Sequence, residues 1–521
     1  MEQTTWFLIA IVIYLIGVLL IGYLGYRKTT GYDDYMVGGR GLHPFVAALS
    51  AGASDMSGWL LMGLPGAIYL SGLNQTWIAI GLCIGAWANW KLTAPRLRTY
   101  TAAAKNSITI PSFLENRLED RTKVLRVAAG IIILVFFTFY VSSGMVAGGR
   151  YWESTFGGDY HTGMLLVAGV TVLYTLFGGF LAVSYTDTVQ GVIMFVALVL
   201  VPVIALITLS GEGTPVSEIF SWPAENPYPG SEGEPVGEYF NMFSGIPLIT
   251  TIGLIGWGLG YFGQPHIIVR FMALRSPADA VAGRRYGVTW QVICMIGAVL
   301  VALTSVVYFS NHPEASITDT ESYETIFLDL SRVLFHPLIA GLILTAVLAA
   351  IMSTVSSQLL VTSSALVEDL YRGVVNKNLK SKTSLLLSRV AVALVAVIAA
   401  LIAANPNSSI LALVGFAWAG FGAAFGPVVI ASLYWRRLNV PGAAAGMLTG
   451  AVVSFAWGMS PLTETLYEIV PGVLASIIAM VAVTLATKPP AQSVVDKYEA
   501  ALEESRVPAA PKGAAVKVEK A

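Results

Sequence analysis

Long apolar segments recur along the whole chain, and they constrain its fold more than any other feature of the sequence. A helix needs about 20 predominantly apolar residues to cross the hydrocarbon core of a bilayer. Segments of roughly that length cover residues 6–26, 43–71, 75–94, 125–152, 162–181, 186–210, 243–270, 284–308, 336–366, 384–404, 408–435, 442–459 and 467–487. The sequence therefore predicts an all-α polytopic membrane protein with about 13 transmembrane helices.

Composition excludes several classes of protein. Hydrophobic residues make up 55% of the chain and charged residues only 12%, whereas soluble domains carry about 25% charged residues. The net charge of −1 provides no basic surface for nucleic acid. Cys83 and Cys294 lie in apolar segments, and the five histidines are scattered. We expect no metal cluster, no nucleophile–base pair, no organic cofactor and no obligatory protein partner, so the chain is not predicted to be an enzyme.

The charge of the short loops alternates along the chain and orients the predicted helices. The basic residues are Arg27, Lys28 and Arg40 after the first span; Arg96, Arg98, Lys105, Arg117, Arg121, Lys123 and Arg126 after the third; Arg270, Arg275, Arg284 and Arg285 after the seventh; Arg372, Lys377, Lys380, Lys382 and Arg389 after the ninth; and Arg436 and Arg437 after the eleventh. By contrast, residues 211–238 contain six glutamates and no Lys or Arg. Because basic loops stay in the cytoplasm, we expect the N-terminus outside and the C-terminus inside.

The segment 43–71 combines polar residues with helix breakers at bilayer depth. These residues are Ser50, Gly52, Ser54, Asp55, Ser57, Gly58, Gly63 and Pro65. An ionised carboxylate such as Asp55 costs at least about 2.5 kcal/mol there, and non-helical backbone is tolerated only where protein or a wet cavity satisfies it. The alternative is a polar residue packed between helices, with small residues for close approach. The coincidence of acid, hydroxyls and breakers favours a binding site.

The seventh segment is interrupted in the same way. Residues 253–265 contain five glycines and Pro265. Three of the glycines match the G-x-G-x-x-G pattern, but no strand precedes them, which excludes a nucleotide-binding turn. A helix broken at mid-membrane would present Trp257 and Tyr261 on one side. The alternative is a glycine-rich packing seam.

Two interrupted segments, five spans apart, indicate an inverted-repeat secondary transporter. Spans two to six (43–210) and seven to eleven (243–435) would form the two repeats. The other units would be a peripheral first span with its cytoplasmic loop (1–42), an extracellular acidic loop (211–242), peripheral spans twelve and thirteen (436–487) and a partly disordered cytoplasmic tail (488–521).

Hydroxyls of the ninth segment suggest a cation site. Ala350, Ser353 and Thr354 share one helix face. Their oxygens, with the carbonyls of Ala53 and Met56 freed by unwinding, would suit a small monovalent cation, whereas Ca²⁺ would need carboxylates. The alternative is that the hydroxyls bond back to their own helix.

Five blocks of this sequence resemble the sodium/solute symporter family, and within it the sodium/proline symporters. They are residues 38–40, 50–66, 184–190, 256–266 and 418–427. The second block is long and specific, and the resemblance covers roughly residues 5–487. It implies a LeuT-type core of 5+5 helices in the cell (inner) membrane that couples Na⁺ entry to L-proline uptake by alternating access. The loop 211–242 and the tail beyond Lys488 are longer than this resemblance leads us to expect.

The resemblance also implies roles for individual residues. Na⁺ would be held by Ala53, Met56, Ala350, Ser353 and Thr354 and supported by Asp55. The proline pocket would be shaped by Ser57, Trp59, Gly63, Tyr140, Trp257, Tyr261 and Pro265. Arg40 and Asp187 would affect coupling and gating.

Several alternatives remain open at the level of sequence. Tyr140 would serve equally as a core residue, Arg40 as a positive-inside anchor, and Asp187 as the counter-charge of Arg40 or a helix cap. The transported solute would be L-proline or another small organic molecule, and the coupling ion Na⁺ or H⁺. A different class of protein, a transporter-like receptor, is disfavoured because no cytoplasmic signalling domain is evident.

Overall fold

The computed structural model describes residues 3–27, 38–219, 239–243, 246–375 and 381–506. In this part of the chain the regular structure is helical, apart from a single parallel bridge between Leu42 and Leu274, so the predicted all-α class is confirmed. Lys28, Lys377, Lys380, most of the acidic loop and the tail beyond residue 506 lie outside the described residues.

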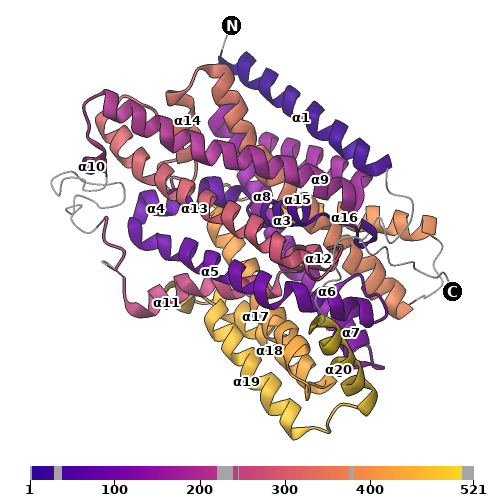
Figure 1. Ribbon diagram of the computed structural model, residues 1–521. Helices are drawn as coiled ribbons and strands as arrows, with labels where there is room; N and C mark the ends of the chain where they lie inside the picture. The colour runs from indigo at the N-terminus through magenta and orange to yellow at the C-terminus, as the bar shows by residue number, and fades with distance from the viewer. Residues whose placement is uncertain (1–2, 28–37, 220–238, 244–245, 376–380, 507–521) are drawn as a thin grey trace.

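The helices alternate between long membrane-length elements and short connecting ones (Figure 1). The first half consists of α1 (Gln3–Arg27), η1 (Gly38–Arg40), α3 (Pro44–Asp55), η2 (Trp59–Gly63), α4 (Leu64–Ser71), η3 (Leu73–Gln75), α5 (Thr76–Leu92), α6 (Ala94–Ala103), α7 (Ile110–Leu118), α8 (Val124–Phe156), α9 (Tyr160–Gly211) and α10 (Val216–Ile219). The second half consists of α11 (Leu248–Gly256), η5 (Trp257–Gly263), α12 (Pro265–Met272), α13 (Asp279–Asn311), α14 (Ile326–Leu334), α15 (Pro337–Ser364), η6 (Ala365–Val375), α16 (Ser381–Ala403), α17 (Ile410–Tyr434), α18 (Val440–Gly458), η7 (Pro461–Glu464), α19 (Ile469–Ala486) and α20 (Gln492–Arg506).

Nine helices of the described chain are long and apolar enough to cross a membrane, and the bent pair of α3 with the helix that follows it would add a tenth if the pair forms one span. Three further predicted segments fall on shorter apolar helices: α5, Tyr160–Leu173 and Leu248–Gly263. The count of 13 crossings therefore stays a prediction.

The fifth and sixth predicted spans join differently from the expectation. The sequence suggested a short loop between residues 181 and 186, but α9 is helical there and is broken earlier, at Gly179. That glycine has φ 73° and ψ 173°, a conformation that L side chains rarely adopt. The small residue, rather than a polar loop, therefore sets the boundary.

Both predicted interruptions are present in the structure. α3 ends at Asp55, and the helix that resumes at Trp59 is turned by 63°. The seventh segment changes from α11 to the 3₁₀ helix η5, and extended backbone at Gln264 separates it from α12. The broken ends meet in the middle of the bundle, where α3 and α12 lie beside α8 and α15 (Figure 1).

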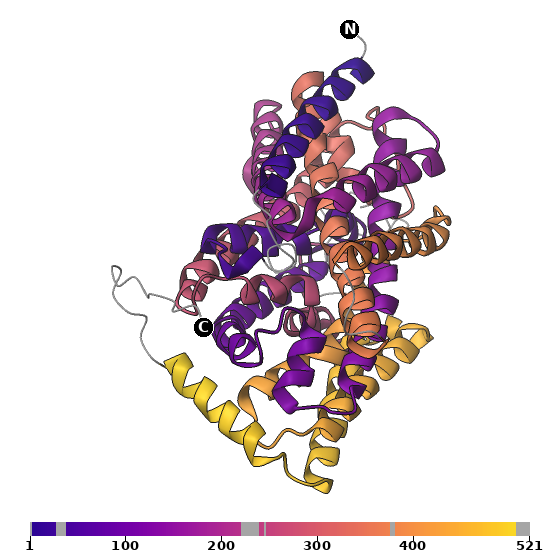
Figure 2. The same ribbon diagram turned by 90° about the vertical axis from the view of Figure 1, so that its right-hand side faces the viewer.

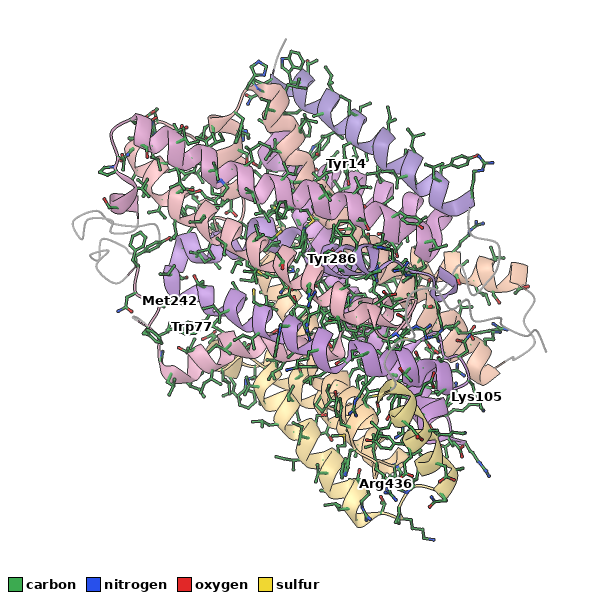
Figure 3. All side chains as sticks on the ribbon, viewed as in Figure 1. Tyr14, Trp77, Lys105, Met242, Tyr286 and Arg436 are labelled. Carbon is green, nitrogen blue, oxygen red and sulfur yellow. The ribbon has the colours of Figure 1, made fainter. Side chains whose placement is uncertain are left out.

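The two ends of the bundle hold different ends of the described chain. Trp6 contacts His336, which places the start of α1 beside the start of α15. The C-terminal helix α20 packs at the opposite end against α6, where Tyr100 contacts Tyr498; it lies at the lower edge of Figure 2. Figure 3 shows Lys105 and Arg436 toward this end and the Trp77–Met242 contact at the other.

Glycines allow α5 to approach the broken seventh span closely. A Cβ added to Gly85 would overlap the carbonyl of Gly258, and one added to Gly258 would overlap the carbonyl of Gly81. We expect Gly85→Ala to destabilise the protein by about 1–3 kcal/mol. The added methyl group would overlap the backbone of Gly258, which cannot move aside as the end of a flexible side chain can. Denaturant titration in detergent micelles would measure this.

The matched control is Gly17→Ala in α1, where an added Cβ meets nothing within 4 Å. This substitution should be neutral or stabilising by up to about 1 kcal/mol, because alanine favours helix. Equal stability of the two variants would contradict the close contact.

Candidate cation and substrate site

The residues predicted to bind a cation come together where α3 ends. The Ser353 hydroxyl donates to the Ala53 carbonyl at 2.7 Å and that of Thr354 to the same oxygen at 3.3 Å. Ser353 also lies 3.1 Å from the Ala350 carbonyl. All of these residues are buried, and so is Met56, which follows the last residue of α3. The shared face predicted for the ninth span is therefore present and is turned toward the second span.

This donor set fits a monovalent hard cation. The last carbonyls of a helix lack intrahelical partners and carry the negative end of its dipole. Here such a carbonyl lies beside the hydroxyls of Ser353 and Thr354. Each hydroxyl can rotate so that an oxygen lone pair faces an ion. Neutral oxygens supply every contact of Ser353 and Thr354 to α3, which suits Na⁺ better than a divalent ion.

Asp55 occupies the end of α3, and its carboxylate contacts η5. Oδ2 accepts the Tyr261 hydroxyl at 2.5 Å, and that hydroxyl accepts the Gln291 amide at 2.8 Å. Oδ1 is buried and makes no hydrogen bond with a described residue. The Asp55 carbonyl accepts from Trp59 at 3.0 Å and from Tyr140 at 3.2 Å. The sequence singled out Tyr261 and Tyr140 but did not indicate Gln291.

Aromatic rings gather beside this break. Trp59 and Trp257 lie 6.3 Å apart between ring centroids, and Trp257 stacks on Tyr467 at 4.9 Å. Tyr261 instead makes an edge contact with Trp418 at 5.0 Å. The predicted common side of Trp257 and Tyr261 is wrong, because η5 is a 3₁₀ helix. Side chains eclipse there at i, i+3, so residues four apart diverge.

The other predicted pocket residues have varied surroundings. Tyr140 contacts His266 in an edge arrangement at 5.7 Å, and the Ser57 hydroxyl accepts the Trp59 amide at 3.4 Å. Gly63 faces α17, where an added Cβ would lie 3.2 Å from Leu411. Pro265 lines a small cavity of about 30 Å³ together with Arg270 and Asp369 instead of packing against the Trp59–Trp257 pair.

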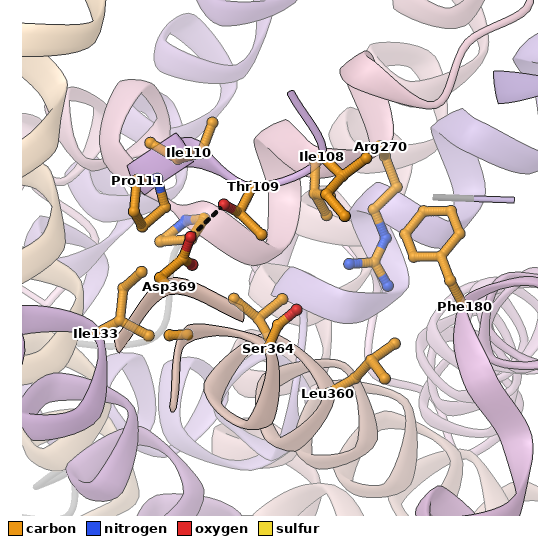
Figure 4. A pocket seen from close by; sticks show the side chains of 14 residues that line it. Ile108, Thr109, Ile110, Pro111, Ile133, Phe180, Arg270, Leu360, Ser364 and Asp369 are labelled. Atoms are coloured by element: carbon orange, nitrogen blue, oxygen red, sulfur yellow. Dashed lines mark hydrogen bonds between the residues drawn. The ribbon is translucent and has the colours of Figure 1, made fainter. Parts of the chain in front are cut away.

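That cavity contains a second polar cluster (Figure 4). Thr109 donates to Asp369 at 2.8 Å, and Arg126 pairs with Asp369 at 3.2 Å. The contacts join the start of α7 and α8 to η6. They tie two connecting segments that are 260 residues apart in sequence.

The interpretation of Arg270 as a basic loop residue is wrong. Its side chain is only 1% exposed, and it pairs with Asp187 at 3.1 Å. Ser50 donates to the same carboxylate oxygen at 2.8 Å, and the Ser357 hydroxyl accepts from Arg270 at 2.6 Å. Hydropathy alone did not place Arg270, because it lies near the end of its apolar segment. The sequence signal for a buried charge is an arginine that lies about one and a half helical turns beyond Pro265, inside the predicted apolar segment 243–270.

The arginine therefore links its own span to three others, and Asp187 has Arg270 rather than Arg40 as its counter-charge. Arg40 instead donates to Thr101 at 3.0 Å, to the Met272 carbonyl at 3.2 Å and to the Ser107 carbonyl at 2.8 Å. It thereby clamps the end of α12 to α6. The two gating residues predicted together belong to two separate polar clusters.

Several known proteins are similar to this chain in sequence or in fold. Residues 35–450 match the model of the sodium:solute symporter family. The high-affinity proline transporter PutP of Bacillus subtilis is 53% identical, covering 92% of this chain and 98% of its own. The osmoregulated proline transporter OpuE of the same organism is 50% identical over 93% of this chain and 96% of its own. The sodium/proline symporter of Escherichia coli is 47% identical over 96% of each chain.

Solved structures with the same fold are more distant in sequence. A Na⁺-coupled sialic acid symporter in a substrate-bound outward-open state superposes with a TM-score of 0.75 at 19% identity, covering 94% of this chain and 99% of its own. A nucleobase-cation-symport-1 family transporter in a closed conformation superposes with a TM-score of 0.53 at 14% identity, covering 90% of this chain and 99% of its own. With the family model matching most of its length and close relatives matching nearly all of it, this chain belongs to the sodium:solute symporter family.

Proposed function

We propose that this protein imports L-proline into the cell, coupled to Na⁺ entry, by alternating access. The observation that carries the proposal is the meeting of Ser353 and Thr354 with the freed carbonyl of Ala53 at a broken helix. Relatives named as proline transporters or sodium/proline symporters, 47–53% identical over most of the chain, support the substrate. Half-helix ends at mid-membrane are where such transporters bind ions and carboxylates.

The proposal gives each residue the role that the resemblance to the family implies. Ala53, Met56, Ala350, Ser353 and Thr354 hold Na⁺, with the negative charge of Asp55 nearby. Ser57, Trp59, Gly63, Tyr140, Trp257, Tyr261 and Pro265 shape the proline pocket. Arg40 and Asp187 act in gating through the separate polar clusters that each of them joins.

The aromatic cluster suits a small zwitterion with an apolar ring. The faces of Trp59 and Trp257 are able to cover the methylenes of proline and attract its ammonium group. Freed carbonyls at the end of α3 accept from that ammonium, and the N-terminus of α12 favours its carboxylate. The packing of α3 against α12 supports this part of the proposal.

The proposed membrane arrangement is 13 spans with a 5+5 inverted-repeat core, the N-terminus outside and the C-terminus in the cytoplasm. The opposite positions of α1's start and α20 support this orientation, and so do the basic residues near α20. Basic loops favour the cytoplasmic side.

Uptake of labelled proline into proteoliposomes tests the function directly. An inward Na⁺ gradient should drive accumulation, and an equal K⁺ gradient should not. Accumulation with either cation but steep in pH would instead indicate H⁺ coupling. No proline uptake by folded protein would reject this substrate and call for a wider solute screen.

The Asp55→Asn variant should need at least about tenfold more Na⁺ for half-maximal uptake, because a charge near the ion is worth more than about 1.5 kcal/mol in such a site. Its amide still accepts from Tyr261, so the fold should persist. The control is Asp496→Asn on the exposed face of α20, which should transport normally. Unchanged Na⁺ dependence in Asp55→Asn would remove Asp55 from the proposed site.

A further inference from the structure

A second, larger cavity opens at the end of the bundle that carries α20. Its volume is about 640 Å³, and it lies where α7 and α19 end and α18 and α20 begin. Leu118, Val440, Ala486 and Val494 contribute apolar wall, while exposed Arg121 and Lys488 add positive charge. The cavity shares no lining residue with the cation and substrate site, so the proposed transport does not account for it.

A buried cation lies directly behind one wall of this cavity. Arg117 is only 3% exposed and donates to the carbonyls of Ser432 at 3.2 Å and Val494 at 3.4 Å. Its guanidinium lies 5.0 Å from the centre of the Tyr498 ring. It forms no ion pair with a described residue, and its Nη2 has no hydrogen-bond partner among them. Because Val494 lines the cavity, a buried positive charge with no ion-pair partner among the described residues lies behind this wall.

The one acidic residue among the lining residues is already engaged. Glu119 pairs with Lys497 and accepts the Ser493 hydroxyl at 2.9 Å, so it fastens the start of α20 to the end of α7. Hydrogen bonds from Lys497 and Ser493 hold the pKa of Glu119 below its ordinary value. Its charge is matched by Lys497, and the cavity as a whole is left positive through Arg117, Arg121 and Lys488.

Lipid-facing surface runs up to the rim of the cavity. Val452 on α18 is 64% exposed, and Ile478 and Leu485 on α19 are 68% and 55% exposed. Such apolar exposure on membrane helices is the surface that acyl chains cover. Leu485 directly precedes the wall residue Ala486. A lipid whose acyl chains lie along α19 would therefore have its polar headgroup at the cavity.

We propose that this cavity binds the headgroup of an anionic phospholipid, with Arg121 and Lys488 contacting its phosphate. Basic pockets between helices at the cytoplasmic side characteristically hold such headgroups, and the cytoplasmic leaflet is anionic. The occupant would bridge the end of α19 to the start of α20. Since α20 also packs on α6, the lipid would fasten the cytoplasmic end of the bundle.

Thermal unfolding of the full-length protein in phosphatidylcholine nanodiscs tests the proposal, with phosphatidylglycerol added in increasing mole fraction. The unfolding temperature should rise and saturate with phosphatidylglycerol. In the double variant Arg121→Gln/Lys488→Gln, about 25-fold more phosphatidylglycerol should be needed for the half-maximal rise, because each basic residue near an anionic surface contributes roughly fivefold.

The matched control is Arg284→Gln/Arg285→Gln, which removes two basic residues at the start of α13, outside the cavity. It should respond to phosphatidylglycerol like the parent protein. Three results would overturn the proposal: an equal effect of the two double variants, an unfolding temperature that stays at its pure-phosphatidylcholine value as phosphatidylglycerol is added, or an equal rise with inorganic phosphate in detergent without lipid. None of these measurements depends on transport, so they are separate from the test of proline uptake.

Discussion

Replacing Arg270 with glutamine is expected to destabilise the protein by about 3–5 kcal/mol, because it leaves the buried Asp187 charge without its partner. The carboxylate is completely buried, and among the described residues it receives only hydroxyl donors besides this arginine, from Ser50 at 2.8 Å and Ser357 at 3.4 Å. Denaturant titration in detergent micelles would measure the loss, and transport should fall with it because the cluster joins α3, α9, α12 and α15.

Adding Asp187→Asn to Arg270→Gln should restore part of that stability. The double variant removes the uncompensated charge and leaves neutral groups able to hydrogen-bond, so its cost should be smaller than the sum of the two single costs. The control is Arg275→Gln, which breaks the partly exposed pair with Asp279 at 3.2 Å and should cost about 0–1 kcal/mol. Additive costs of the two buried substitutions would contradict a direct coupling between Arg270 and Asp187.

The second large effect is expected at the proposed Na⁺ site. Thr354→Ala should raise the Na⁺ concentration for half-maximal proline uptake by about 10- to 100-fold, because a contact between a hydroxyl and a charged group is worth about 1.5–3 kcal/mol. Ser353→Ala should act in the same direction, since its hydroxyl lies closer to the Ala53 carbonyl. Uptake at varied external Na⁺, with K⁺ holding the ionic strength constant, would measure both.

Two controls separate ion binding from packing. Thr354→Ser keeps the hydroxyl and should keep most of the Na⁺ affinity. Thr362→Ala removes a buried hydroxyl of the same helix that bonds only within it, to the Gln358 carbonyl at 2.6 Å, so Na⁺ dependence should not change. A similar shift in Thr362→Ala and Thr354→Ala would show that the effect comes from the helix and not from a Na⁺ ligand.

Much of the fold could be predicted because it depends on local properties of the chain. Helix-forming apolar segments, the break after Asp55 and the break before Pro265 follow from composition and from the conformational preferences of glycine and proline. The common face of Ala350, Ser353 and Thr354 follows from the helical repeat. The symporter family was also recognisable from the sequence, and the comparisons confirm it.

The partners of these residues could not be predicted in the same way. Arg270 meets Asp187 across 83 residues, and Tyr261 meets Asp55 across 206. The spacing of residues along one helix does not show which other helix that helix packs against. For this reason the sequence suggests Arg40 as a partner of Asp187 and places Arg270 in a loop. The 3₁₀ conformation of η5 likewise reflects packing against α5 and α17, and it separates two aromatic rings that an α-helix would align.

The class of protein, the helices, their interruptions and the hydroxyl face of the ninth span are all local properties of the chain, because each arises from interactions between residues near one another. The pairing of buried charges, the direction of the Asp55 carboxylate and the closure of a positively charged cavity by α20 depend on the packing of the helices. Those outcomes depend on contacts between distant helices, where burial makes an unpaired charge costly and therefore selects its partner.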